Sequence, residues 1–235
     1  MMPKPTVDVQ IWSDVMCPWC AIGFAQYSKA LDALGDNIEV TTRWMPFELN
    51  PDLPAEGKDQ QKHLAEVYRR SAEETAAMRQ RLMDAADRAG FPMRWTGPNG
   101  SGAEEPAAWM WNTFEAHKLL RWALAVHGPE AQGRLSEALF RAHFQQRRPI
   151  GEREVLLAIA EEQGFDRAEA AAALDEEALA VATRLEERRG LQMGINSVPS
   201  FIVNGRYLIP GAQGPEVYAA TLRKVAEMAE AGASG

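Results

Sequence analysis

The spacing of hydrophobic residues along the chain changes twice, and these changes outline a predicted fold. Near the N-terminus apolar and polar residues alternate, which is typical of β-strands. From Lys58 to Gly190 apolar residues recur instead at helical spacing, and strand character returns towards the C-terminus. There, Asn204-Gly205 predicts a two-residue hairpin turn. The predicted strands are Val7–Trp12, Ile38–Trp44, Ser200–Val203 and Arg206–Ile209.

The long helical stretch is divided at glycine, proline and capping residues. One continuous helix is predicted from His63 to Ala89, followed by an irregular segment from Phe91 to Trp111. A helix capped at Asn112-Thr113 should end at Gly128-Pro129, where the next one begins. Further helices are predicted to start near Glu152, Asp166, Glu176 and Pro215, and the run Glu186-Glu187-Arg188-Arg189 is expected to form a solvated helix face.

This order of elements predicts an α/β protein with a large all-helical insertion between the second and third strands. Residues 6–56 and 191–231 are expected to form one discontinuous domain, and residues 57–190 an inserted helical domain.

Two cysteines stand where the first predicted strand meets the helix that follows it. In Cys17-Pro18-Trp19-Cys20, Pro18 suits the first helical turn, where its missing N–H costs nothing. Cys17 would lie at the helix N-terminus and Cys20 one turn later, close enough for a disulfide. The helix dipole favours a thiolate at Cys17. We therefore expect Cys17 to be an exposed, acidic thiol and Cys20 to be shielded.

Two other uses of a Cys-x-x-Cys pair are less favoured. A structural zinc site needs four ligands, and these are the only cysteines. The histidines, with no His-x3–5-His spacing, do not complete such a site, so no metal is expected. An inert structural pair seldom opens a helix directly after a strand. Redox or other thiol chemistry is the favoured use of the motif.

Composition narrows the range of partners. The 235-residue chain has a net charge of −8 and a pI near 5.2, which argues against general binding to nucleic acid or to anionic membranes. No apolar signal-peptide core follows Met1, and no apolar run is long enough to span a bilayer. We expect a cytoplasmic protein that is a monomer or a homodimer. In the reducing cytoplasm, a lone pair of cysteines is usually catalytic and not structural.

The stretch Ser13–Cys20, followed by Ile22-Gly23, resembles the active-site segment of the DsbA family of thioredoxin-fold proteins, and within it the FrnE-like branch. The resemblance extends from about Val7 to about Tyr218. It implies a thioredoxin-like fold that carries the helical insertion. It also relates the chain to 2-hydroxychromene-2-carboxylate isomerases and kappa-class glutathione transferases.

The resemblance assigns supporting roles around the two cysteines. Val198-Pro199 matches the cis-proline that lies opposite the cysteines in this fold and leaves backbone groups free to pair with a bound thiol peptide. Pro18, Trp19 and Asp14 are expected to support the active site. Ile11 occupies the position of a buried acid in many relatives, so Asp14 or solvent must accept the proton of the second cysteine.

Three residues are candidate contacts for a thiol ligand. Asn50 and Gln213 match loops that contact glutathione in the glutathione-dependent relatives, although Asn50 also suits an ordinary turn before a proline. His117 is either an acid–base group near the thiols or a packed histidine. The tryptophans of the irregular segment either line a substrate cleft or fill the junction between elements: Trp95, Trp109 and Trp111.

The favoured function is thiol–disulfide exchange of the reductase or isomerase type, in which Cys17 forms a mixed disulfide and Cys20 resolves it. The substrate would be a disulfide-bearing protein or a small thiol, with no bound cofactor and with glutathione as a redox partner. The alternative is a glutathione-dependent isomerase or transferase that uses glutathione as cosubstrate and acts on a small aromatic compound. A non-enzymatic chaperone is a third interpretation. The glutathione-dependent relatives usually have serine in place of Cys17, so two cysteines favour redox chemistry.

Overall fold

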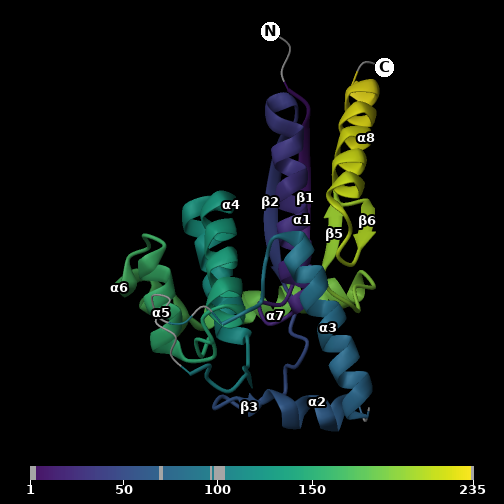
Figure 1. The fold of residues 1–235 in the computed structure, drawn as a ribbon. Helices are drawn as coiled ribbons and strands as arrows, with labels where there is room; N and C mark the ends of the chain where they lie inside the picture. Colours follow the sequence, from purple (N-terminus) through teal and green to yellow (C-terminus); the bar gives the residue numbers. More distant parts are fainter. Residues whose placement is uncertain (1–3, 69–70, 96, 98–103, 234–235) are drawn as a thin grey trace.

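A four-stranded sheet lies towards one side of the molecule, and the helical segment between its second and third strands in the chain extends below and to the left of it (Figure 1). The computed structural model describes residues 4–68, 71–95, 97 and 104–233. The strand order is β2-β1-β5-β6, with β1 and β2 parallel and the other neighbouring pairs antiparallel. All four predicted strands are confirmed. Their bounds are Thr6–Ser13 for β1, Glu39–Pro46 for β2, Ser200–Val203 for β5 and Tyr207–Pro210 for β6.

The hairpin between β5 and β6 forms where the sequence predicts it. Asn204 and Gly205 both have positive φ, 49° and 65°, as a turn that matches the twist of the strands requires. Arg206 belongs to this turn, since its N–H donates to the Val203 carbonyl at 3.1 Å. The returning strand therefore starts at Tyr207, one residue later than predicted.

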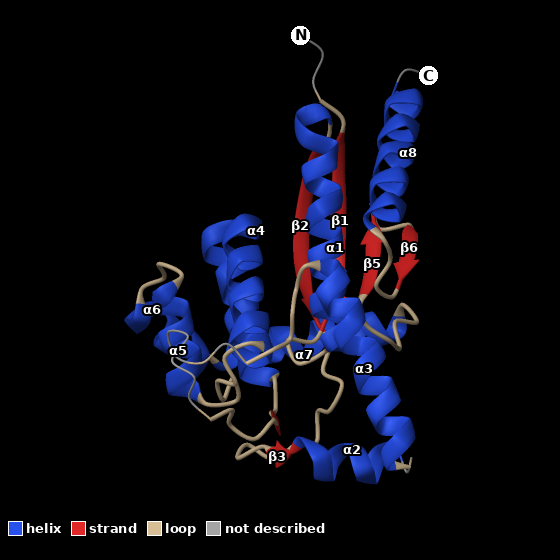
Figure 2. Ribbon diagram, viewed as in Figure 1, coloured by secondary structure: helices blue, strands red, loops and turns tan. Residues whose placement is uncertain are grey.

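Two helices cover one face of the sheet. Alternate residues of β1, Val7, Val9 and Ile11, are buried in one apolar cluster with α1 (Pro18–Leu34) and α8 (Pro215–Ala233). Figure 2 shows both helices running along the sheet. The alternation that predicts β1 therefore also determines which of its side chains face these helices.

The opposite face is covered by α7 (Glu177–Gln192), which approaches the sheet at a glycine. Trp12 is completely buried, and a Cβ atom at Gly190 would lie 2.4 Å from its ring. Met45, Ile195 and Ile202 complete this smaller cluster. Only glycine allows α7 to pack so closely against Trp12, near the C-terminal end of β1.

The segment between β2 and β5 is mainly helical, as predicted, and Figure 2 shows α4 beside β2. A one-turn 3₁₀ helix, Gly35–Asn37, follows α1. The helices of the segment are α2 Gln60–Tyr68, α3 Ala72–Ala89, α4 Phe114–Phe144, α5 Arg153–Glu162, α6 Arg167–Asp175 and α7.

Two predictions about this segment are wrong. The single helix expected from His63 to Ala89 is two helices, because Ser71 and Glu74 form a reciprocal capping box that starts α3. The segment from Phe91 to Trp111 is not wholly irregular, since β4 (Trp109–Met110) pairs with β3 (Lys58–Asp59). Residues 96 and 98–103 lie outside the described part of the chain.

The predicted break in the long helix is confirmed. Gly128, with φ 85° and ψ 177°, and Pro129 separate two helical halves within α4. In the second half, the buried amide of Gln132 accepts from the Trp44 N–H and donates to the Trp44 carbonyl, both at 2.8 Å. This side chain satisfies backbone groups at the open edge of β2, which would otherwise be free to pair with another strand.

The independence of residues 57–190 as a domain stays a prediction. The cluster beneath α1 and the sheet also includes Ala86, Phe91 and Phe140 from the helical segment. In the described part of the chain, no helix combines the length and apolarity needed to cross a bilayer.

Replacing Gly190 with alanine should destabilise the protein. Alanine gains about 1 kcal/mol over glycine inside a helix. Overpacking a core costs about 1–3 kcal/mol or more, and the buried Trp12 ring leaves no room for the methyl group. We expect a net loss of about 1–3 kcal/mol in the free energy of unfolding, measured with urea.

Gly133→Ala is the matched control, because its methyl group would meet only Trp44 Nε1, at 3.8 Å. Gly133 also lies inside a helix. This variant should be neutral or more stable by up to about 1 kcal/mol. An equal loss in both variants would show that close packing at Trp12 is not the cause.

Candidate functional site

The two cysteines lie in the first turn of α1. Cys17 is the N-cap residue, with φ −80° and ψ 115°, and Pro18 is the first helical residue, as predicted. The N–H groups of Cys20 and Ala21 both donate to the Cys17 carbonyl, at 3.0 and 3.2 Å. Both cysteines are free thiols. A dithiol therefore stands at the point where β1 passes into a helix.

The expected exposure of Cys17 is wrong. Its side chain is 3% exposed and that of Cys20 is 1% exposed. Cys17 Sγ lies 3.7 Å from the Val198 carbonyl oxygen, and the Val198–Pro199 peptide bond is cis. The chain segment that precedes β5 therefore covers the first thiol. Trp19, 47% exposed, is the motif side chain that faces solvent.

The surroundings of Cys20 disfavour its thiolate. Burial, followed by the hydrogen bond and charge of the neighbouring Cys17, raises the pKa of Cys20 well above its ordinary value. The Ser13 hydroxyl lies close to the Cys20 sulfur and favours the thiolate, but more weakly. Ser13 Oγ nevertheless makes no hydrogen bond of ordinary geometry.

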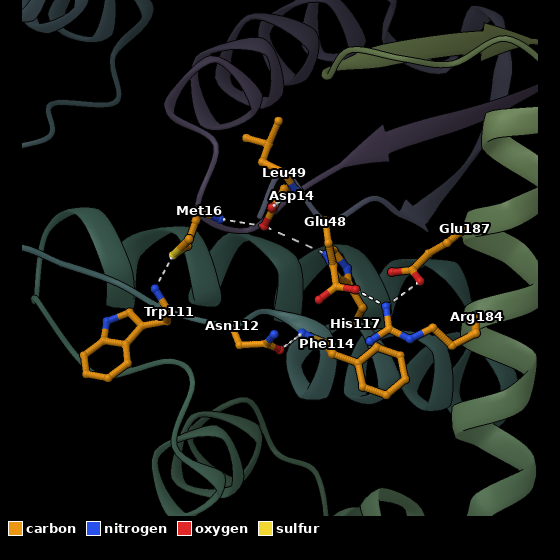
Figure 3. Close-up of polar contacts among 10 residues, drawn as sticks. All are labelled: Asp14, Met16, Glu48, Leu49, Trp111, Asn112, Phe114, His117, Arg184 and Glu187. Carbon is orange, nitrogen blue, oxygen red and sulfur yellow. Dashed lines mark hydrogen bonds and ion pairs between the residues drawn. The ribbon is translucent and has the colours of Figure 1, made fainter. Parts of the chain in front are cut away.

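Asp14 holds together the loops around the dithiol (Figure 3). Its carboxylate accepts the Met16 N–H at 3.1 Å and the Leu49 N–H at 2.7 Å, and the Thr113 hydroxyl also lies against it. Complete burial raises the pKa of Asp14 to about 6, although these donors lower it. At neutral pH the group is therefore mainly a carboxylate.

His117 is packed behind this carboxylate. Its Nε2 is 3.9 Å from Asp14 Oδ1, too far for a hydrogen bond, and its side chain is 3% exposed (Figure 3). Burial lowers the pKa of His117 to about 4, although Glu187 and the Phe47 backbone raise it. The imidazole is therefore neutral at pH 7. The structure places it beside Asp14, as a packed histidine with an unpaired ring nitrogen.

A charged cluster that the sequence did not indicate lies next to His117. Arg184 pairs with the buried Glu48 and, at 2.9 Å, with Glu187, and its guanidinium stacks 3.6 Å above the Phe114 ring (Figure 3). Burial and the charge of Glu187 raise the pKa of Glu48 to about 7. The expected solvated face at residues 186–189 is therefore wrong for Glu186 and Glu187, which pair with Arg121 and Arg184. No local pattern links Glu48 to this helix.

The candidate ligand contacts have different surroundings. The Gly211 N–H donates to the Pro199 carbonyl at 2.8 Å, which places the loop of Gln213 against the cis-proline segment. The Gln213 amide itself donates to the Pro210 carbonyl at 2.6 Å. Asn50 Oδ1 instead lies 3.0 Å from Nε2 of His63 on α2. The structure thus brings Gln213 towards Pro199, whereas the Asn50 side chain is engaged by a helix of the insertion.

An aromatic pair borders the motif from the insertion side. The Trp111 N–H lies 2.8 Å from the sulfur of Met16, the residue before Cys17 (Figure 3). Trp111 stacks on Trp109, with ring centroids 5.7 Å apart, and Trp109 is 39% exposed. Among the described residues, no group of three or more His, Cys, Asp or Glu side chains could hold a metal ion.

Comparisons with known proteins show the family of the chain and a solved structure with a similar fold. The family model for the DSBA-like thioredoxin domain matches residues 8–223. The chain belongs to this family. It is also similar to the probable DsbA oxidoreductase SCO1869 of Streptomyces coelicolor, with 31% identity and a TM-score of 0.77 over 93% of this chain and 89% of that one.

Two further relatives extend the comparison. The uncharacterized protein YwbO of Bacillus subtilis is 28% identical over 214 residues, which cover 91% of this chain and 94% of YwbO. The cytosolic disulfide reductase DsbM of Pseudomonas aeruginosa, solved with GSH, is 20% identical, with a TM-score of 0.61 over 92% of this chain and 98% of that one. The last likeness shows the shared fold alone. The predicted thioredoxin-like fold of this DsbA-family chain is confirmed.

Alkylation of the reduced protein at neutral pH should modify Cys17 first. The raised pKa of Cys20 leaves almost none of it as thiolate, and the thiolate is the reactive form. Mass spectrometry after brief iodoacetamide treatment should find one label, on Cys17. The Cys17→Ser variant should stay nearly unlabelled, whereas rapid labelling of Cys20 in wild type would contradict the assignment.

Stability should depend on His117 between pH 7 and pH 4. A folded pKa below the ordinary 6.5 means that the stabilisation is present above pH 6.5 and is lost as the pH falls towards 4. The loss is about 3 kcal/mol. Over the same range Asp14 acts oppositely, because its raised pKa removes the cost of a buried charge as the pH falls.

His117→Gln should therefore lose about 3 kcal/mol less than wild type between pH 7 and pH 4 in urea unfolding. His127→Gln, on the exposed surface of the same helix, controls for the loss of a histidine. Equal pH dependence in wild type and His117→Gln would contradict the shifted pKa.

Proposed function

We propose that the chain is a thiol–disulfide oxidoreductase of the FrnE-like branch, acting by reductase- or isomerase-type exchange through Cys17 and Cys20. One observation carries the proposal: two free thiols lie in the first turn of α1, and Cys17 Sγ is 3.7 Å from the Val198 carbonyl beside Pro199. The family of the chain supports an enzyme of this general kind.

In the proposed reaction the Cys17 thiolate attacks one sulfur of a substrate disulfide. A mixed disulfide forms and the other substrate sulfur leaves as a thiolate. Cys20 then loses its proton and attacks Cys17, which releases the second substrate sulfur and leaves a Cys17–Cys20 disulfide. Two electrons pass to the substrate. Two molecules of glutathione, as redox partner, return the protein to the dithiol and leave as glutathione disulfide.

The residues around the dithiol support these steps by position. The backbone at Val198 and Pro199 would hold the substrate chain beside Cys17 as an added strand. Pro18 fixes the start of the helix, and Asp14 holds the preceding loop in place. Trp19 offers an exposed apolar contact to the substrate.

The proposed substrate is a disulfide-bearing protein or a small disulfide of the glutathione type. Gln213 and Asn50 remain proposed contacts for a thiol ligand, whereas the burial of His117 behind Asp14 disfavours it as a ligand contact. The contact between the loop of Gln213 and Pro199 favours Gln213 most. We propose a cytoplasmic location and no bound cofactor, with the cytosolic disulfide reductase DsbM as the relevant neighbour in fold.

Single replacements of the two cysteines test the proposal. With glutathione as reductant, wild type should reduce insulin and reactivate a scrambled substrate. Cys17→Ser should abolish both activities, because the attacking sulfur is gone. Cys20→Ser should lower insulin reduction by about 100-fold and accumulate mixed disulfides that mass spectrometry detects at Cys17.

The alternative function, a glutathione-dependent isomerase or transferase, predicts the opposite result for Cys20→Ser. It requires activity that survives Cys20→Ser, together with saturable glutathione binding to wild type. A wild type that binds glutathione tightly but catalyses neither exchange reaction would replace the redox proposal with this alternative. The double variant Cys17→Ser, Cys20→Ser gives the background rate.

A further inference from the structure

A small cavity with a mixed apolar and polar lining lies behind the cysteine motif, between the C-terminal ends of β1 and β2 and helices α4 and α7. Its volume is about 10 Å³, which is room for about one water molecule. Three of its lining side chains carry polar atoms that no other group satisfies: Ser13, His117 and Ser136.

In the part of the chain that the structure describes, Ser13 Oγ, His117 Nε2 and Ser136 Oγ are buried and have no hydrogen-bond partner. The three residues are 4%, 3% and 1% exposed. Buried polar atoms nearly always have a partner, and a buried water typically makes about three hydrogen bonds. The number of unpaired atoms matches the capacity of the cavity.

Ser13 connects the cavity with the surroundings of the second thiol. Ser13 is the last residue of β1, and its hydroxyl lies close to the Cys20 sulfur as well as lining the cavity. Ser13 therefore belongs both to the surroundings of the second thiol and to the lining of the cavity. Ile11, on the same strand, cannot accept a proton, so Cys20 has no adjacent acid on β1.

We propose that the cavity binds one ordered water, held by Ser13 Oγ, His117 Nε2 and Ser136 Oγ, and that Ser13 and this water carry away the proton of Cys20 when it resolves a mixed disulfide. The proposal rests on the proposed function and adds a route for the proton that the resolving step must release.

In that step the Cys20 S–H proton passes to Ser13 Oγ as the Ser13 O–H proton passes to the water. The Cys20 sulfur bonds to Cys17, and the bond from Cys17 to the substrate sulfur breaks. The water releases a proton past Arg121 and Glu186, the partly exposed pair that also lines the cavity. The departing thiolate takes a proton from solvent, which closes the balance.

His117 holds the water and is not the final base. Burial keeps its pKa near 4, so its neutral ring offers Nε2 as a hydrogen-bond acceptor. Ser13 transfers the proton itself, whereas Ser136 and His117 act through the water and are positioning residues. The titratable and charged groups that face this route are Cys17 and Tyr218 at Cys20, Asp14, Arg184 and Glu187 at His117, and Arg121 and Glu186 at the cavity.

The experiment separates the two thiol steps. Reduced protein is mixed with one equivalent of dithiobis(nitrobenzoate) in a stopped-flow instrument. Attack by Cys17 releases one coloured thionitrobenzoate, and attack by Cys20 on the resulting mixed disulfide releases the second. Ser13→Ala should leave the first phase unchanged and slow the second by about tenfold or more. The pH midpoint of the second phase should move upwards.

Matched variants distinguish a relay from a packing defect. Ser13→Thr keeps a hydroxyl and should restore most of the second-phase rate. Ser136→Ala, which removes only a ligand of the water, should slow that phase severalfold. Thr183→Val removes a buried hydroxyl that bonds the Leu179 carbonyl outside the cavity, so both phases should keep their wild-type rates.

Each outcome decides a different point. If wild type releases only one thionitrobenzoate, the proposed function fails. If wild type releases two and Ser13→Ala matches it in rate and pH midpoint, the relay is overturned and the function stands. If Ser13→Ala is slow but Ser136→Ala is not, the water site is overturned. Should Ser13→Ala fail to fold, Ser136→Ala carries the test.

Discussion

The buried carboxylate of Asp14 fixes the backbone on which the dithiol depends. One oxygen accepts the Met16 N–H from the loop before Cys17, and the other accepts the Leu49 N–H from the loop after β2. Hydrogen bonds to a charged group contribute about 1.5–3 kcal/mol each. Burial, which raises the pKa of Asp14, opposes their contribution. The structural effect of the carboxylate lies in holding two loops in one geometry.

The helical segment between β2 and β5 completes the site rather than merely covering it. Gln132 closes the edge of β2 at Trp44, Gly190 admits Trp12 beneath α7, and His117 is packed behind Asp14. Trp111 reaches Met16 from the same segment. The residues at and just after the end of β1 are therefore in contact with residues that lie about 100 to 180 positions later in the chain.

Local patterns predicted the parts of the fold that local physics determines. Alternation in β1, the proline after Cys17 and the Asn204-Gly205 turn each specify a backbone conformation within a few residues. The break before α3 also has a local signal, because Ser71 and Glu74 have capping-box spacing. The apolar residues on both sides of it keep one continuous helical period, which favours a single helix instead. The pairing of β3 with β4 joins segments 50 residues apart, and two-residue strands carry no period.

The site was predictable in its residues but less so in its environment. The motif located both thiols, yet the burial of Cys17 depends on Val198, 181 positions away. The cluster of Glu48 with Arg184 likewise joins residues 136 positions apart. His117 could be named as a candidate, but its neutral state follows from burial, which no spacing reveals.

In the proposed reaction, the order in which the two thiols act follows from their offset of one helical turn. Cys17 precedes the helix, so its sulfur faces the carbonyl of Val198, where an incoming chain would bind. Cys20 lies inside the first turn, its N–H bonded to the Cys17 carbonyl and its sulfur directed to Cys17 and Ser13. In the proposed reaction substrate therefore meets Cys17 first. Cys20, whose pKa is raised by burial, then reacts with the sulfur of Cys17 in the mixed disulfide.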